Sequence, residues 1–156
     1  MHTLHLGDLL VKHGVLSAAQ RDAVLEAQRV RGGPFGAIAE QMFGVNPTLV
    51  EQAWAEQYAS MAPHMDPRAY PVSARTLEII SKRQAWQFRL LPLEMTGREL
   101  LACTTQEALP RALKFAGWRL GHGVRFVIAD PKALGEALEK HYPMAGMSAD
   151  MMLEPV

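Results

Sequence analysis

The sequence predicts an α+β protein, in which an N-terminal helical tandem-repeat subdomain packs on a small three-stranded αββαβα sandwich. Three observations predict this fold class. Residues 5–28 and 34–57 share a common pattern, helical and strand periods alternate over residues 73–142, and 49% of the 156 residues are apolar whereas 21% are charged. A chain of this size and composition can bury a substantial core without a disulfide or a structural metal.

The N-terminal segment, residues 1–59, contains an internal duplication of 24 residues. The two copies are separated by the spacer 29–33, and a shift of 29 positions superimposes them. Glycines, apolar residues and a closing glutamine then fall in register, which indicates two copies of one supersecondary motif. The aligned pairs are Leu6 and Phe35, Gly7 and Gly36, Leu25 and Trp54, and Gln28 and Gln57.

Each copy predicts a short helix, a turn and a longer helix. In the first copy, Leu6, Leu9 and Leu10 recur at helical spacing. Gly14 suits the end of the short helix, and Ser17 is a favourable N-cap for the longer one. The second copy repeats this arrangement with Phe35, Ile38 and Met42 on the apolar face, Gly44 at the turn and an Asn46-Pro47 cap.

Residues 60–72 come next, and three prolines within nine positions there disfavour helix and predict an extended connector. Residues 73–142 then alternate between helical and strand patterns. The expected strands 88–95 and 99–104 flank a glycine-containing turn and predict a hairpin. Helices are expected over 73–84, 107–120 and 130–142, and a third strand over 124–129.

The final segment, residues 143–156, has no helical or strand period. It contains two prolines and four of the nine methionines, a composition that does not specify a packed element. We therefore expect a mobile tail. The alternative is that the methionines form an adhesive contact segment, because Met side chains are flexible and apolar.

The formal net charge of zero is the sum of segments of opposite sign. Residues 1–60 carry four basic and six acidic residues, residues 61–142 carry twelve basic and eight acidic residues, and residues 143–156 carry two acidic residues. The absence of a net positive charge argues against a nucleic acid polymer as the partner. The basic excess over residues 61–142 is either a solvated face or a docking surface for an acidic partner.

The sequence offers no recognisable catalytic or metal-binding pattern. Cys103 is the single cysteine and lies in an apolar strand, so we expect a buried structural thiol in a reducing compartment. The six histidines lack metal-ligand spacing, and no Gly-x-x-x-x-Gly-Lys-Ser/Thr phosphate loop occurs. Without a basic leader or an apolar run of about 20 residues, we expect a cytoplasmic protein that lacks membrane insertion, cofactor and metal.

The first copy of the repeat resembles the long cyclic-di-GMP-binding motif in the N-terminal domain of type II secretion and type IV pilus assembly ATPases, the MshE N-terminal type. The αββαβα segment is also similar to the second subdomain of that bacterial family, so the resemblance covers residues 4–142. In the motif, the likeness is carried by Leu6, Gly7, Leu10, Gly14, Leu16, Leu25 and Gln28.

The resemblance implies a non-enzymatic regulatory module that binds cyclic di-GMP through its two repeats and signals to a protein partner in a secretion or pilus machine. Its glycines would let the ligand approach the backbone, its apolar and aromatic side chains would stack on the bases, and its glutamines would bond to guanine edges. The implied ligand-binding residues are His5, Leu6, Gly7, Leu10, Gly14, Leu25, Gln28, Phe35, Gly36, Trp54 and Gln57.

The sequence departs from the family pattern at several positions. The leading arginine of the motif is His5 in the first copy and Pro34 in the second, and Arg21 occupies an apolar position. These 156 residues contain no ATPase domain, so we expect either a stand-alone module or a fragment. The departures keep an alternative open, which is a protein–protein adaptor whose degenerate nucleotide site does not bind.

Overall fold

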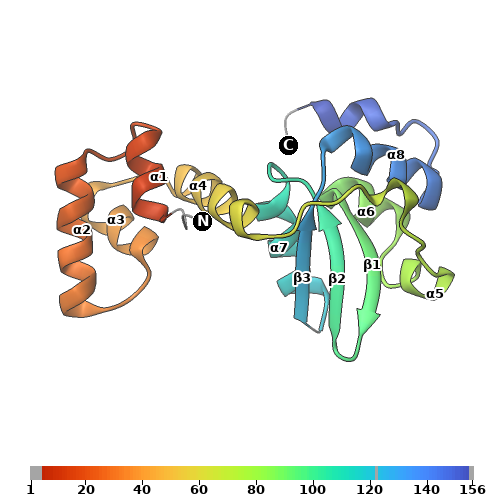
Figure 1. Cartoon of the computed structure of the whole chain (residues 1–156), viewed down its shortest axis with the longest axis horizontal. Helices are drawn as coiled ribbons and strands as arrows, with labels where there is room; N and C mark the ends of the chain where they lie inside the picture. The colour runs from red at the N-terminus through yellow and green to blue at the C-terminus, as the bar shows by residue number, and fades with distance from the viewer. Residues whose placement is uncertain (1–4, 122, 155–156) are drawn as a thin grey trace. The chain divides into compact units, whose positions relative to one another are not determined.

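The computed structural model of the chain describes residues 5–121 and 123–154. It divides into an N-terminal unit, Met1–Met61, and a C-terminal unit, Ala62–Val156. The described elements of the N-terminal unit are helices, whereas the C-terminal unit combines helices with a three-stranded sheet (Figure 1). The expected α+β class is thereby confirmed. None of the described helices is long and apolar enough to cross a membrane.

The helices of the N-terminal unit alternate between short and long (Figure 1). They are α1 (Leu6–Lys12), α2 (Ala18–Arg31), α3 (Phe35–Phe43) and α4 (Pro47–Met61). Each short–long pair covers one copy of the repeat, and α2 and α4 continue three and four residues past the closing glutamines. Because neither pair can bury its apolar face alone, the two copies share one core. Its buried members are Leu9, Leu10, Leu16, Val24, Ile38, Ala39, Val45 and Ala53.

Short polar motifs decide where these helices begin and end. Ser17 and Gln20 form a capping box before α2, in which each side chain accepts a bond from the backbone N–H of the other, at 3.0 and 2.9 Å. The side chain of Asn46 accepts from a backbone N–H in the first turn of α4. Gly14 and Gly44 follow α1 and α3 with φ of 73° and 64°, a conformation that glycine adopts readily.

The C-terminal unit is built on a sheet with the strand order β1-β2-β3. β1 (Leu90–Thr96) and β2 (Glu99–Thr104) are antiparallel and form the expected hairpin, with Gly97 in the turn. β2 and β3 (Gly123–Ile128) are parallel. Parallel neighbours need a long crossover, and α7 (Leu109–Arg119) supplies it.

The helix expected over residues 73–84 is interrupted. The structure has two helices there, α5 (Ala74–Leu77) and α6 (Lys82–Phe88). Ser81 and Gln84 form a second capping box. It starts a new helix, because a serine side chain that bonds a nearby backbone N–H competes with continuation of the preceding helix. Since α6 occupies the start of the expected strand, β1 begins two residues later than expected.

The segment expected to be an extended connector, residues 60–72, contains helical turns and contacts the sheet. α4 covers its first two residues, and η1 (Pro67–Ala69) is a short 3₁₀ helix within it. Between them the chain runs beside the end of β3. The N–H of Met65 donates to the carbonyl of Ile128, and the N–H of Ile128 donates to Pro63, both at 2.9 Å. The segment therefore follows a defined path along the sheet despite its three prolines.

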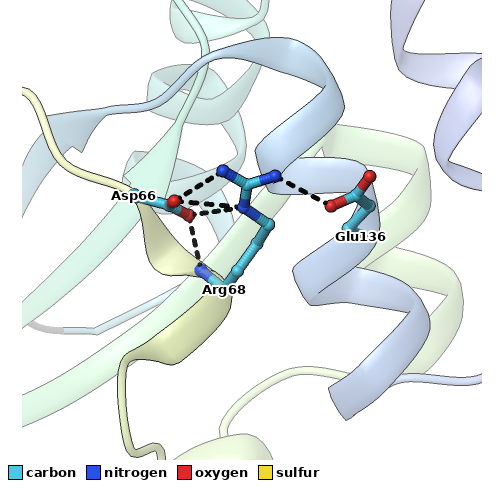
Figure 2. A network of polar contacts seen from close by, with 3 residues as sticks. All are labelled: Asp66, Arg68 and Glu136. Carbon is cyan, nitrogen blue, oxygen red and sulfur yellow. Dashed lines mark hydrogen bonds and ion pairs between the residues drawn. The ribbon is translucent and has the colours of Figure 1, made fainter.

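Arg68 joins this segment to α8 (Pro131–His141), as Figure 2 shows. Its guanidinium donates to both carboxylate oxygens of Asp66 at 2.7–3.1 Å and to Glu136 of α8 at 3.1 Å. The bonds that Asp66 accepts from the guanidinium and from the backbone N–H of Arg68 lower its pKa to about 2. Because these side chains are 36–53% exposed, the network orients residues 66–68 on α8 but adds little to the free energy of unfolding.

The segment after α8, which the sequence predicts to be a mobile tail, packs against α8. Its 3₁₀ helix η2 (Ala149–Leu153) buries Ala149 and Met152 and closely approaches Gly135. Arg89 donates to two backbone carbonyls of this segment, at 3.0 and 3.2 Å. A helical period could not reveal these contacts, because they depend on a small residue in the partner helix rather than on an apolar stripe.

We predict that Gly135→Ala destabilises the C-terminal unit. An added Cβ would lie 2.7 Å from the Cα of Ala149 and 2.8 Å from its carbonyl oxygen, so η2 or α8 must shift. Overpacking of this kind costs about 1–3 kcal/mol of unfolding free energy, which urea unfolding measures. The matched control is Gly117→Ala in α7, where a Cβ meets nothing within 4 Å and stability should rise by up to about 1 kcal/mol. Equal effects of both substitutions would contradict this account.

We also predict that the thiol of Cys103 is unreactive in the folded protein. The residue is fully buried in β2, and burial, aided by the negative charge of Asp66, raises its pKa to about 12. Because the thiolate is the reacting species, Ellman's reagent near neutral pH should give no colour until denaturant unfolds the chain. Rapid reaction with an unchanged circular dichroism spectrum would overturn this prediction.

Candidate ligand-binding site

A pocket with a volume of about 560 Å³ lies in the N-terminal unit. Its volume falls in the range of small-molecule sites, which is about 300–1,000 Å³. All four helices of the unit, or the residues directly before them, contribute to the lining. The lining residues are His5, Leu6, Gly7, Asp8, Arg21, Leu25, Gln28, Pro34, Phe35, Gly36, Trp54 and Gln57.

The two copies of the repeat surround the pocket with equivalent residues. Ten of the twelve lining residues form five pairs related by the shift of 29 positions. The exceptions are Asp8 and Arg21, whose equivalents in the second copy are Ala37 and Val50. A ligand in the pocket would therefore meet two similar sets of side chains. The pairs are His5 and Pro34, Leu6 and Phe35, Gly7 and Gly36, Leu25 and Trp54, and Gln28 and Gln57.

Nine of the eleven residues expected to bind ligand line this pocket, and two do not. Leu10 is fully buried in the core of the unit. Gly14 lies beyond the end of α1 with φ of 73°, where it terminates the helix. Both residues belong to the repeat motif, but their place in this structure is that of a core residue and a helix terminator.

Sequence reasoning did not assign Asp8, Arg21 or Pro34 to the site. A signal for Arg21 was present, because Arg21, Leu25 and Gln28 are spaced by four and three and so share one face of α2. Asp8 carries no such signal. It lines the pocket beside Arg21 of α2, and only the fold brings these two residues together.

Gly7 is packed closely against protein on the side where a Cβ would lie. An added Cβ would lie 2.8 Å from the ring of Phe35 and 3.1 Å from the Cγ of Arg21. Side chains of α2 and α3 therefore occupy the place next to the backbone of α1. Gly7 therefore has a packing role on this side, and the approach of a ligand to its backbone stays a prediction.

Gly36 is packed closely by its own copy and is touched by the other copy. An added Cβ there would lie 2.6 Å from Cγ1 of Val50 and 3.6 Å from Leu6. Leu6 and Phe35 are equivalent positions, so each copy places the residue before its own glycine against the glycine of the other copy. This reciprocal contact joins the two copies, and its four residues line the pocket.

Arg21 brings a permanent positive charge to the pocket, but carboxylates already accompany that charge. Its guanidinium donates to Asp8 at 3.0 Å and to Asp22 at 3.2 Å. Its methylene stem packs on Gly7, so an arginine can occupy a position that is apolar in the family pattern. The side chain is 29% exposed. An anionic ligand would compete with the two carboxylates for this guanidinium.

Exposed apolar side chains occur at equivalent positions of the two copies. Leu25 is 47% exposed and Trp54 is 37% exposed, and both line the pocket. The ring centroid of Trp54 lies 5.5 Å from that of Tyr58, with the planes tilted by 46°. An indole held by a neighbouring ring and open to solvent offers a face for a flat aromatic ligand.

Polar contacts hold the walls of the pocket. Nε2 of Gln28 donates to the carbonyl of Gly33 at 3.1 Å, which fixes the spacer between the two copies. Nε2 of His13 lies 2.6 Å from the carboxylate of Glu56, and this bond joins α1 to α4 and lowers the pKa of Glu56. Within residues 5–121 and 123–154, no group of three or more His, Cys, Asp or Glu is arranged to hold a metal ion.

The α+β fold and the pocket between duplicated helical motifs define a class of small two-unit domain with a ligand-sized site in its helical unit. The chain belongs to the MshEN domain family, whose sequence pattern matches residues 60–148. The expected family is thereby confirmed. The matched range falls almost wholly in the C-terminal unit, so the family match rests on the αββαβα segment rather than on the repeat.

Two further comparisons extend to the repeat. A solved structure of MshE with cdg, the abbreviation of cyclic di-GMP, is 26% identical, with a TM-score of 0.50 over 89% of this chain and 99% of that chain. The type IV pilus assembly ATPase PilB of Myxococcus xanthus (strain DK1622) is 21% identical over 145 residues, which are 93% of this chain. The chain spans 25% of the length of that relative.

The N-terminal domain of XpsE is a further structural match. It is 15% identical, with a TM-score of 0.48 over 88% of this chain and 93% of that chain.

We predict that Gly36→Ala destabilises the N-terminal unit whether or not a ligand is present. The new methyl group would lie 2.6 Å from Val50, and such overpacking costs about 1–3 kcal/mol. Urea unfolding of the single variants and of the Gly36→Ala/Val50→Ala double variant forms the test. Because the two positions touch, the double variant should be less destabilised than the sum of the single variants. Strict additivity would show that the contact at Gly36 is not tight.

Proposed function

We propose that the chain is a non-enzymatic regulatory module whose N-terminal unit binds cyclic di-GMP. The observation that carries the proposal is the pairing of equivalent residues from the two copies around one pocket of about 560 Å³. A ligand made of two identical halves suits two similar sets of side chains. The likeness to MshE with cdg, at 26% identity over 89% of this chain, supports the same ligand.

In this proposal the exposed apolar pair supplies the main contacts with the bases. Trp54 stacks on one guanine, and Leu25 covers the equivalent position on the other. Base–aromatic stacking contributes about 1–3 kcal/mol per base. His5 adds a second ring at the mouth of the first half-site, and the side-chain amides of Gln28 and Gln57 offer both donors and acceptors for the edges of the bases.

Arg21 contacts the phosphates of the ligand after it gives up part of its bonding to Asp8. Each good charge-assisted bond lost to one carboxylate is replaced by one to a phosphate oxygen, so the net gain is small. Arg21 therefore supplies a cation to the first half-site, where His5 stands in place of the leading arginine of the family motif. Pro34 leaves the second half-site dependent on apolar contacts.

The bound state is passed to a protein partner in a secretion- or pilus-type machine, in the cytoplasm. The similarity to the pilus assembly ATPase of Myxococcus xanthus supports this class of partner. Ligand binding would draw α1–α4 around one small molecule, and the partner would respond to the altered helical unit.

The decisive experiment is calorimetric titration of the purified chain with cyclic di-GMP. We expect measurable binding, weakened about tenfold or more by Trp54→Ala because a stacking contact is lost. Trp118→Ala is the matched control, since Trp118 is also exposed but lies in the other unit, and it should leave binding unchanged. No heat at tens of micromolar protein, with the fold intact by circular dichroism, would refute the proposal.

Two further substitutions test the electrostatic part of the same experiment. His5→Arg adds the permanent cation that the family motif carries and should tighten binding. Asp8→Asn removes one carboxylate from Arg21 and should also tighten binding, because the guanidinium then reaches a phosphate at a lower cost. Weaker binding by either variant would contradict the roles assigned to these residues.

A second candidate function is a protein–protein adaptor with a degenerate nucleotide site. The pairing of Arg21 with both Asp8 and Asp22 favours it, because an anionic ligand must displace carboxylates that are already in place. Absence of binding in the titration, together with an intact fold, would select the adaptor.

A further inference from the structure

The exposed face of α7 combines an aromatic side chain with positive charge. Trp118 is 78% exposed, although a side chain of this size is usually well buried. Lys114 and Arg111 are exposed one and two turns earlier on the same face, at intervals of four and three residues. The guanidinium carbon of Arg119 lies 5.9 Å from the centroid of the Trp118 ring, within the range of a cation–π contact.

The opposite face of α7 is already used by the fold. Leu109, Ala112, Phe115 and Ala116 are buried, and Phe115 stacks on Phe88 at the end of α6, with centroids 4.4 Å apart. The helix therefore cannot turn Trp118 inward without losing its own core contacts. The packing of the buried face of α7 therefore keeps Trp118 on the outer face of the helix.

The neighbouring helix carries further positive charge. α6 contributes the exposed Lys82 and Arg83, and neither α6 nor α7 contains an aspartate or glutamate. The two helices touch, so five basic side chains accompany Trp118 without a carboxylate on either helix. Glu107 lies just before α7, and its carboxylate interacts electrostatically with Arg89.

We propose that this surface, formed by Trp118, Arg111, Lys114 and Arg119 and extended by Lys82 and Arg83, docks an acidic protein segment that carries an apolar side chain. Tryptophan and arginine are the residues most enriched at the energetic centres of protein interfaces. The ring would take the apolar side chain, while the surrounding cations would pair with carboxylates and speed the encounter.

A protein segment fits better than a membrane or a nucleic acid. A helix that lies in a membrane surface needs a wide apolar face, but the apolar face of α7 is buried in the protein. The C-terminal unit carries twelve basic and ten acidic residues, an excess too small for a protein that grips phosphates along a polymer. The surface lies wholly in the C-terminal unit and does not depend on the proposed cyclic di-GMP pocket.

The test is a nuclear magnetic resonance titration of the full chain with a short synthetic peptide of glutamates around a central leucine. We expect the indole N–H of Trp118 and the backbone amides of α7 to shift, with an affinity that falls as salt rises. Trp118→Ala, and separately Arg111→Glu/Lys114→Glu, should weaken the affinity about tenfold or more. A peptide with lysine in place of glutamate should cause no shifts.

Two control variants separate the surface from general effects of charge or exposure. Val30→Ala truncates a residue that is 72% exposed in the other unit, and Lys132→Glu/Lys140→Glu reverses two exposed charges on α8. Both should leave the affinity for the acidic peptide unchanged. The spectrum of each variant without peptide reports whether it has folded.

Several results would overturn the proposal. These are no shifts in α7 at about 1 mM peptide, which would half-saturate even a millimolar complex, and an affinity that the α7 variants do not change. Phosphatidylglycerol vesicles or an oligonucleotide that perturbs α7 when the acidic peptide does not would assign the surface to a membrane or a nucleic acid instead.

Discussion

The N-terminal unit depends on the reciprocal contact at its two equivalent glycines. The ring of Phe35 lies where a side chain at Gly7 would be. Val50 lies where one at Gly36 would be, and Leu6 is in van der Waals contact with the same place. Only glycine lets α1 and α3 be approached this closely, and each copy of the repeat supplies part of what the other needs. The four helices can therefore share a single core, and the equivalent residues that surround this contact line one pocket.

The same contact explains the distribution of charge in the pocket. The stem of Arg21 packs on Gly7 while its guanidinium reaches Asp8 and Asp22. An arginine at an apolar position of the motif is thus accommodated without burying its charge. The apolar side chains at Leu25 and Trp54 remain exposed, so the pocket offers apolar contacts more readily than free positive charge.

Close approach at a small residue also organises the C-terminal unit. The backbone around Ala149 approaches Gly135 of α8, and carbonyls of the same segment accept from Arg89. In the same unit, α7 buries its apolar residues in the core, where Phe115 stacks on Phe88. What remains for its outer face is Trp118 and basic side chains, which is why this surface is open to a partner.

Period and local capping were enough to predict the duplicated short–long helix pairs and the β1–β2 hairpin. The family resemblance, rather than period, pointed to nine of the residues that line the pocket. Other contacts appear only in the folded chain. In the fold, Arg21 meets Asp8 and η2 packs on α8. Both contacts join different elements of the chain, and the second also depends on the missing side chain of Gly135. A local sequence pattern describes one element at a time, so it shows neither contact.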